Sequence, residues 1–150
     1  MVEKDAVIER QHYKGLAWVA SMALFMQSLD ATILNTALPT IATDLQTPVF
    51  EMQMAIIAYS LAVALFIPLT AWAAAKFGTL TVFRSAVFTF VFGSVACAMS
   101  TSLETLVLAR ILQGIGGAFM MPVARLAIIQ TVPKNQLINA WNLMATAGLI

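Results

Sequence analysis

Two side chains of opposite charge, Asp30 and Arg110, lie well inside apolar stretches of this sequence. A charge inside a bilayer costs at least about 2.5–3.5 kcal/mol on insertion scales, so such residues predict a functional site. Taking about 1.5 Å of helix per residue, Asp30 lies about 12 Å from the end of its apolar segment near Leu38. Arg110 lies about 10 Å from the end of its own segment near Leu103. The two charges reach similar depths, so they could pair or face one shared cavity.

Each charged residue has a polar neighbour on its own helix face. Gln27 precedes Asp30 by three residues, and Gln113 follows Arg110 by three. Residues at this spacing share one face of a helix. The pattern predicts a polar, partly hydrated cavity, in which an aspartate could take up and release a proton.

Small residues continue the face that carries Arg110. Gly114 and Gly117 follow it by four and seven residues, and glycines of this kind let another helix or a substrate approach the backbone. Tight helix packing and substrate access are equally open readings of these two glycines. Asp30 and Arg110 could also be a structural ion pair that fixes helix register, and Gln27 could be an interhelical hydrogen-bonding residue without a role in transport.

The composition requires a membrane around these residues. Of the 150 residues, 61% are hydrophobic and 10% are charged, and the mean hydropathy is +0.88, whereas soluble domains are roughly 25% charged. The net charge of +1 provides no electrostatic footprint for nucleic acid. The single cysteine, Cys97, excludes a disulfide within the chain. We therefore predict an all-α, polytopic bundle of transmembrane helices.

Apolar runs and their breakers divide this bundle into spans. A loop is expected from Pro39 to Glu51 and a tight turn around Gly78, because proline and glycine interrupt helices. The last apolar segment supplies roughly half of the about 20 residues that a crossing needs, so the chain is expected to be the N-terminal fragment of a longer transporter. We predict a cytoplasmic tail at residues 1–14 and a partial transporter domain at 15–150, with spans at about 15–38, 52–74, 82–99 and 105–129 and an incomplete span at 140–150.

The basic residues predict the orientation. Apart from Arg110, every Lys and Arg falls before the first span, between the second and third, or at the end of the fourth and just after it. The other two connections carry Asp44, Glu51 and Glu104 and no basic residue. Lys and Arg favour the cytoplasmic side. The N-terminus is therefore predicted to be cytoplasmic, in a multi-pass protein of the cell inner membrane.

Two segments resemble motifs of a known family. The segment Leu29-Asp-Ala-Thr-Ile-Leu-Asn-Thr-Ala-Leu-Pro39 is similar to the first-span motif of the fourteen-helix drug:proton antiporters, a branch of the major facilitator superfamily. The segment Arg110-Ile-Leu-Gln-Gly-Ile-Gly-Gly-Ala118 resembles the fourth-span motif of that superfamily. The resemblance implies the first part of an N-terminal six-helix domain, and that alternating access moves substrate through a central cavity.

The resemblance also assigns roles to residues. It implies that Asp30 and Arg110 take part in proton coupling, while the helical spacing places Gln113 and Gln27 beside them in the cavity. The loop between the second and third spans departs from the family pattern. It keeps a basic residue, Lys76, and the glycine Gly78, but Ala75 stands where the family has an aspartate. A charge latch at this cytoplasmic gate is therefore in doubt.

We thus expect a transporter that exports drugs or other small molecules in exchange for protons. Neither a nucleophile with its base nor a metal-ligand spacing occurs, and the Gly114–Gly117 segment lacks the Lys-Ser/Thr that follows a phosphate-binding loop. No enzyme activity, cofactor or metal is expected, because the proton gradient drives the process. The expected partners are the lipid bilayer, a small-molecule substrate and the missing C-terminal part of the same chain, without which the fragment should not transport. Two alternatives remain open: an exporter of one metabolite, organic anion or metal chelate, and a stand-alone small membrane protein that assists assembly or regulation.

Overall fold

The computed structural model describes residues 2–131, 137–138 and 142, and over this part of the chain it contains helices and turns but no strand. This confirms the all-α prediction. The five helices are α1 (Val2–Asp44), α2 (Val49–Phe66), α3 (Leu69–Phe77), α4 (Thr79–Ala98) and α5 (Leu103–Thr131).

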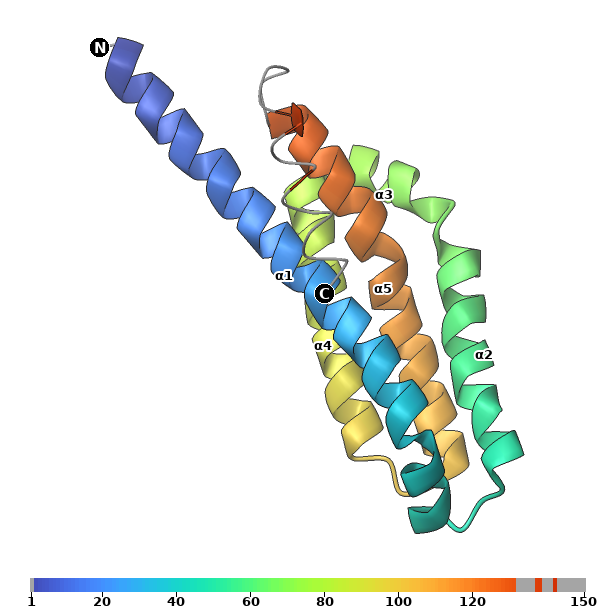
Figure 1. Ribbon diagram of the computed structural model, residues 1–150. Helices are drawn as coiled ribbons and strands as arrows, with labels where there is room; N and C mark the ends of the chain where they lie inside the picture. Colours follow the sequence, from blue (N-terminus) through green and yellow to red (C-terminus); the bar gives the residue numbers. More distant parts are fainter. Residues whose placement is uncertain (1, 132–136, 139–141, 143–150) are drawn as a thin grey trace.

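Helix α5 organises the bundle (Figure 1). It packs most extensively against α4 and α2, and less against α1. The α1–α2 and α4–α5 connections lie at one end of the bundle, and the α3–α4 turn lies at the other. The first part of α1 extends away from the other helices. Because α1 has the smaller interface with α5, each contact between these two helices contributes a larger share of what holds them together.

Helix α1 is longer than the sequence predicted. It begins at Val2, so residues 2–14 of the predicted tail are helical, and it runs through Pro39 to Asp44. The prediction of a loop from Pro39 to Glu51 was therefore wrong at its start, since only residues 45–48 connect α1 to α2. Proline removes one backbone hydrogen bond, but burial of Leu38 and Ala42 against Met52 holds this last part of the helix in place.

The predicted second span, 52–74, is not one continuous helix. It divides into α2 and α3 at residues 67–68, and α3 runs at an angle to α2 (Figure 1). Pro68 explains the break, because it lacks an N–H and its ring clashes with the carbonyl of residue 64. The turn is closed by hydrogen bonds from Ile67 N to the Val63 carbonyl (3.0 Å) and from Thr70 N to the Ile67 carbonyl (3.1 Å).

The other connections are short. Gly78 alone separates α3 from α4, with φ of 84°, a backbone conformation that glycine adopts without steric cost. Before α5, Ser102 and Thr105 exchange hydrogen bonds, with Thr105 N donating to Ser102 Oγ at 3.3 Å and Ser102 N donating to Thr105 Oγ1 at 3.1 Å. These contacts satisfy amides that a helix N-terminus leaves without partners.

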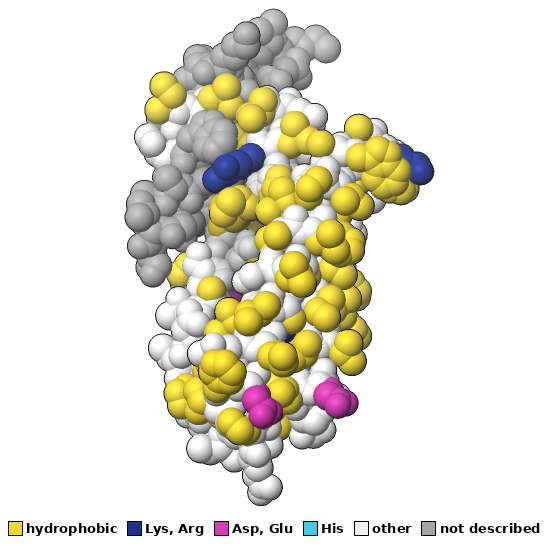
Figure 2. Space-filling view, turned by 90° about the vertical axis from the view of Figure 1, so that its right-hand side faces the viewer, with side chains coloured by type: hydrophobic (Ala, Val, Ile, Leu, Met, Phe, Trp, Pro, Cys, Tyr) yellow, Lys and Arg dark blue, Asp and Glu magenta, His cyan; other side chains and the backbone are white. Residues whose placement is uncertain are grey.

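Three helices in the described part of the chain are long and apolar enough to cross a membrane: Val49–Phe66, Thr79–Ala98 and Leu103–Gln130. Figure 2 shows hydrophobic side chains over the middle of one face, with Lys and Arg towards one end and Asp and Glu towards the other. The crossing of the membrane by α1 remains a prediction, and so does the orientation of the bundle. The predicted fifth span, 140–150, lies outside the described residues apart from Asn142.

Two apolar clusters form the core. The Phe90 cluster, in the half of the bundle that contains α3, comprises Ala20, Ala23, Leu24, Ala73, Val82, Phe83, Ala86, Phe90, Met120, Val123, Ala124 and Ile128. The Met52 cluster, near the α1–α2 connection, comprises Leu34, Leu38, Ala42, Met52, Ala55 and Leu106. Asp30 lies between these clusters along α1, and Arg110 lies between them along α5. The candidate site is therefore a polar layer between two apolar ones.

Candidate functional site

The polar layer is built around the carboxylate of Asp30. Arg110 Nη1 donates to Asp30 Oδ2 at 2.7 Å, and Gln113 Nε2 donates to Asp30 Oδ1 at 2.8 Å. Both donors come from α5, where a spacing of three residues places them on the same face. One aspartate on α1 is thus held at both of its oxygens by one face of α5. The sequence had left open whether the two charges pair, and the structure brings them into contact.

The three members of this network differ in burial. The Gln113 side chain is fully buried, and that of Arg110 is 6% exposed, whereas that of Asp30 is 15% exposed. Arg110 Nε is buried and finds no hydrogen-bond partner among the described residues. A buried guanidinium is costly unless it is paired, so the Asp30 carboxylate is its necessary counter-charge.

Gln113 also connects Asp30 to α4. The Cys97 thiol donates to Gln113 Oε1 with a sulfur–oxygen distance of 3.7 Å. At Gly93 of α4, an added Cβ would lie 2.7 Å from Gln113 Cα, so the two backbones are in close contact there. Cys97 therefore makes a polar contact in addition to apolar packing. Its partner, Gln113, is a residue that the sequence had already indicated.

A second polar pair, Gln27 and Tyr59, joins α1 to α2 about one helical turn from Asp30. Gln27 Nε2 donates to the Tyr59 hydroxyl of α2 at 3.1 Å, while Gln27 Oε1 is buried without a partner in the described part of the chain. Sequence reasoning missed Tyr59. A signal was present, because a tyrosine within an apolar span usually places its hydroxyl on a polar partner.

The two glycines that follow Arg110 meet α2. A Cβ added at Gly114 would lie 2.8 Å from the Tyr59 carbonyl oxygen and 2.9 Å from Ala62 Cβ. At Gly117 it would lie 2.8 Å from the Tyr59 hydroxyl and 3.3 Å from Gln27 Nε2. The space beside Gly114 is therefore filled by a neighbouring helix, which favours packing over substrate access. Gly117 makes room for the Gln27–Tyr59 pair.

Lys76 and Gly78 are not part of the polar layer. Lys76 lies in the last turn of α3 and Gly78 in the α3–α4 turn, at one end of the bundle. The structure thus brings Asp30, Arg110 and Gln113 together, places Gln27 close to them on α1, and leaves the predicted gate residues as a separate feature.

This arrangement suits the movement of a proton. A charged Asp30 accepts two hydrogen bonds from α5, and charge-assisted bonds of this kind are roughly twice as strong as neutral ones. Protonation removes the charge, weakens the link between α1 and α5, and leaves Arg110 without a counter-charge. The contact between α1 and α5 therefore depends on the charge of Asp30.

Comparison with known proteins agrees with a transport role. Residues 20–150 match the model of the Major Facilitator Superfamily. A transport protein, HsrA, of Haemophilus influenzae is 83% identical over 142 residues, which are 95% of this chain and 31% of that protein. Multidrug resistance proteins named MdtD from Salmonella typhi and Yersinia pestis are each 44% identical over 133 residues, or 89% of this chain. These names are assigned to the relatives provisionally.

The matched region is a limited part of each relative. The chain spans less than a third of the length of these proteins, with 31%, 28% and 29% covered. No solved structure is significantly similar to the chain.

Proposed function

Because the chain belongs to the major facilitator superfamily, we propose that it forms the N-terminal part of an inner-membrane transporter that exports drugs or other small molecules in exchange for protons. The family and the names of the relatives indicate a transporter rather than an enzyme. Proton coupling, the direction of transport and the class of substrate are our proposal.

One observation carries this proposal: the Asp30 carboxylate is held by Arg110 at 2.7 Å and by Gln113 at 2.8 Å, yet it keeps 15% of its side-chain surface exposed. The first property links the charge of Asp30 to the contact between α1 and α5. The second leaves part of the Asp30 side chain uncovered by the described residues, and there we propose that a proton reaches it. Together they allow proton binding to alter how the helices are held.

The test measures transport by the full-length protein in inverted membrane vesicles. A pH gradient is imposed, and ethidium accumulation is followed by its fluorescence. We expect Asp30→Asn to abolish accumulation driven by the gradient, because asparagine cannot exchange a proton. Exchange of ethidium down its own concentration gradient should continue. Asp44→Asn is the matched control, since Asp44 lies in the same helix and is exposed.

Two outcomes would contradict the proposal. Accumulation by Asp30→Asn at the wild-type rate would show that Asp30 does not carry the proton. Equal loss of gradient-driven accumulation and downhill exchange, with normal amounts of protein in the membrane, would assign Asp30 a structural role.

One further observation favours a second candidate function, export of an organic anion. Arg110 Nε is buried and has no hydrogen-bond partner among the described residues, so the guanidinium retains a donor for a carboxylate. Radiolabelled succinate in the same vesicles tests this candidate. Gradient-driven uptake of succinate, but not of ethidium, would favour the anion exporter.

A further inference from the structure

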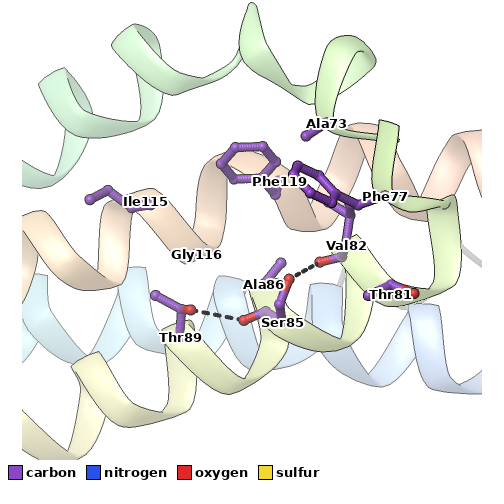
Figure 3. Close-up of a pocket in the computed structure, with 10 residues that line it drawn as sticks. All are labelled: Ala73, Phe77, Thr81, Val82, Ser85, Ala86, Thr89, Ile115, Gly116 and Phe119. Atoms are coloured by element: carbon purple, nitrogen blue, oxygen red, sulfur yellow. Dashed lines mark hydrogen bonds between the residues drawn. The ribbon is translucent and has the colours of Figure 1, made fainter. Parts of the chain in front are cut away.

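A groove opens between α3, α4 and α5, away from the polar layer (Figure 3). Its volume is about 400 Å³, near the lower end of the roughly 300–1,000 Å³ that small-molecule sites occupy. Phe77 projects from α3 and Phe119 from α5, with Ile115 further along α5. We refer to this feature as the α3–α5 groove.

The groove follows from two local features of the sequence. Pro68 ends α2 and sets α3 at an angle to it. Gly116 brings α5 against α4, since an added Cβ would lie 2.6 Å from Phe90 N and 2.8 Å from the Ala86 carbonyl oxygen. The floor is therefore backbone and small side chains.

Two of the three hydroxyl groups along the groove are already in use. Ser85 Oγ donates to the Val82 carbonyl at 2.9 Å, and Thr89 Oγ1 donates to the Ser85 carbonyl at 2.8 Å (Figure 3). These bonds lie within α4, so neither hydroxyl hydrogen is available to a bound molecule. With its remaining lining apolar or backbone apart from Thr81, the groove suits a hydrocarbon chain better than a polar solute.

A fixed positive charge lies beside one end of the groove. Lys76 Nζ is 5.4 Å from the centre of the Phe77 ring, which lines the groove, and 4.8 Å from the centre of the Trp72 ring. Both distances fall within the range of cation–π contacts. These contacts hold the ammonium group near the groove, where it complements a negatively charged group.

We propose that the α3–α5 groove binds one acyl chain of an anionic phospholipid, with Lys76 contacting its phosphate. The groove lies along α4 and α5, two helices that are long and apolar enough to cross a membrane. A charge at one end and an apolar channel beyond it match the two parts of a phospholipid. This site is separate from Asp30, and its occupation does not depend on the transported substrate.

Native mass spectrometry of the full-length protein, purified in a mild detergent, tests the proposal by counting bound lipids. The probes are phosphatidylglycerol, which is anionic, and phosphatidylcholine, which is zwitterionic. We expect one tightly held phosphatidylglycerol, bound about fivefold better than phosphatidylcholine, as one lysine near an anionic headgroup provides. Lys76→Gln should abolish this preference, and Lys76→Arg should retain it.

Ser85→Phe fills the groove and should weaken binding of both lipids at least tenfold. Val95→Phe is its control, because Val95 lies on the same helix, is exposed and does not line the groove. Thr81→Phe, at another exposed lining position, replaces Ser85→Phe if that variant does not fold. The proposed site would be wrong if Ser85→Phe and Thr81→Phe left lipid binding unchanged. It would also be wrong if Val95→Phe weakened lipid binding equally. Absence of bound lipid from the wild type would do the same, and a preference insensitive to Lys76→Gln would overturn the role of Lys76.

Discussion

Gly117 makes room for the hydrogen bond between Gln27 and Tyr59, and this relation can be tested by substitution. In Gly117→Ala, the new Cβ would lie 2.8 Å from the Tyr59 hydroxyl, well inside an ordinary carbon–oxygen contact. The tyrosine must move, and its 3.1 Å bond to Gln27 is lost. We expect the free energy of unfolding to fall by about 1–2 kcal/mol, the combined effect of overpacking and a lost hydrogen bond.

Tyr59→Phe removes the atom that causes the collision. By itself it should cost about 1 kcal/mol, because Gln27 loses its partner. With the hydroxyl gone, the nearest atoms to the new Cβ would be Gln27 Nε2 at 3.3 Å, which is the end of a flexible side chain and can shift, and Tyr59 Cζ at 3.5 Å. The double variant should therefore be about as stable as Tyr59→Phe alone, which gives a coupling energy of about 1–2 kcal/mol.

Gly114→Ala provides the matched comparison. Its Cβ would meet the Tyr59 carbonyl oxygen at 2.8 Å, and the backbone is unchanged in Tyr59→Phe. The two substitutions should therefore be additive. The free energies can be measured by titrating the full-length protein in mixed micelles with sodium dodecyl sulfate. Additive effects of Gly117→Ala and Tyr59→Phe, or rescue of Gly114→Ala by Tyr59→Phe, would refute this account of the two glycines.

Three further predictions follow from the contacts of α5. Gly116→Ala should lower the free energy of unfolding by about 1–3 kcal/mol in the same titration, because its Cβ would lie 2.6 Å from Phe90 N; an unchanged value would show that α4 and α5 separate easily. Gln113→Leu should lower the free energy of unfolding by about 1–3 kcal/mol in the same titration, because Asp30 Oδ1 loses the 2.8 Å hydrogen bond from Gln113 Nε2; an unchanged value would contradict this. Cys97→Ser should retain normal stability and Cys97→Val should lose about 1 kcal/mol, because only serine can still donate to Gln113; equal stability of the two variants would show that the thiol contact is unimportant.

Much of the fold could be predicted from hydropathy and helix-breaking residues. The apolar runs anticipated α4 and α5 to within a few residues at each end. Proline was less informative, since Pro68 divides a predicted span whereas Pro39 lies inside a helix. The two differ in tertiary surroundings: burial of Leu38 and Ala42 secures the helix around Pro39, and no local sequence pattern reveals that packing.

The site was predictable in part. Helical periodicity predicted that Gln113 shares a face with Arg110, and the similar depths of the two charges predicted that Asp30 lies near them. Both predictions succeeded because they depend only on helix geometry. The partners from other helices were beyond this reasoning. Tyr59 and Cys97 reach the network from α2 and α4, and which face of a helix meets its neighbour depends on how the bundle packs.

The central claim is that Asp30 gains and loses a proton within the transporter. Infrared difference spectroscopy of the full-length protein in lipid, between acidic and alkaline pH, measures this most directly. We predict a protonated-carboxyl band in the wild type and in Asp44→Asn that is absent from Asp30→Asn. An identical set of carboxyl bands in Asp30→Asn and the wild type would contradict the claim.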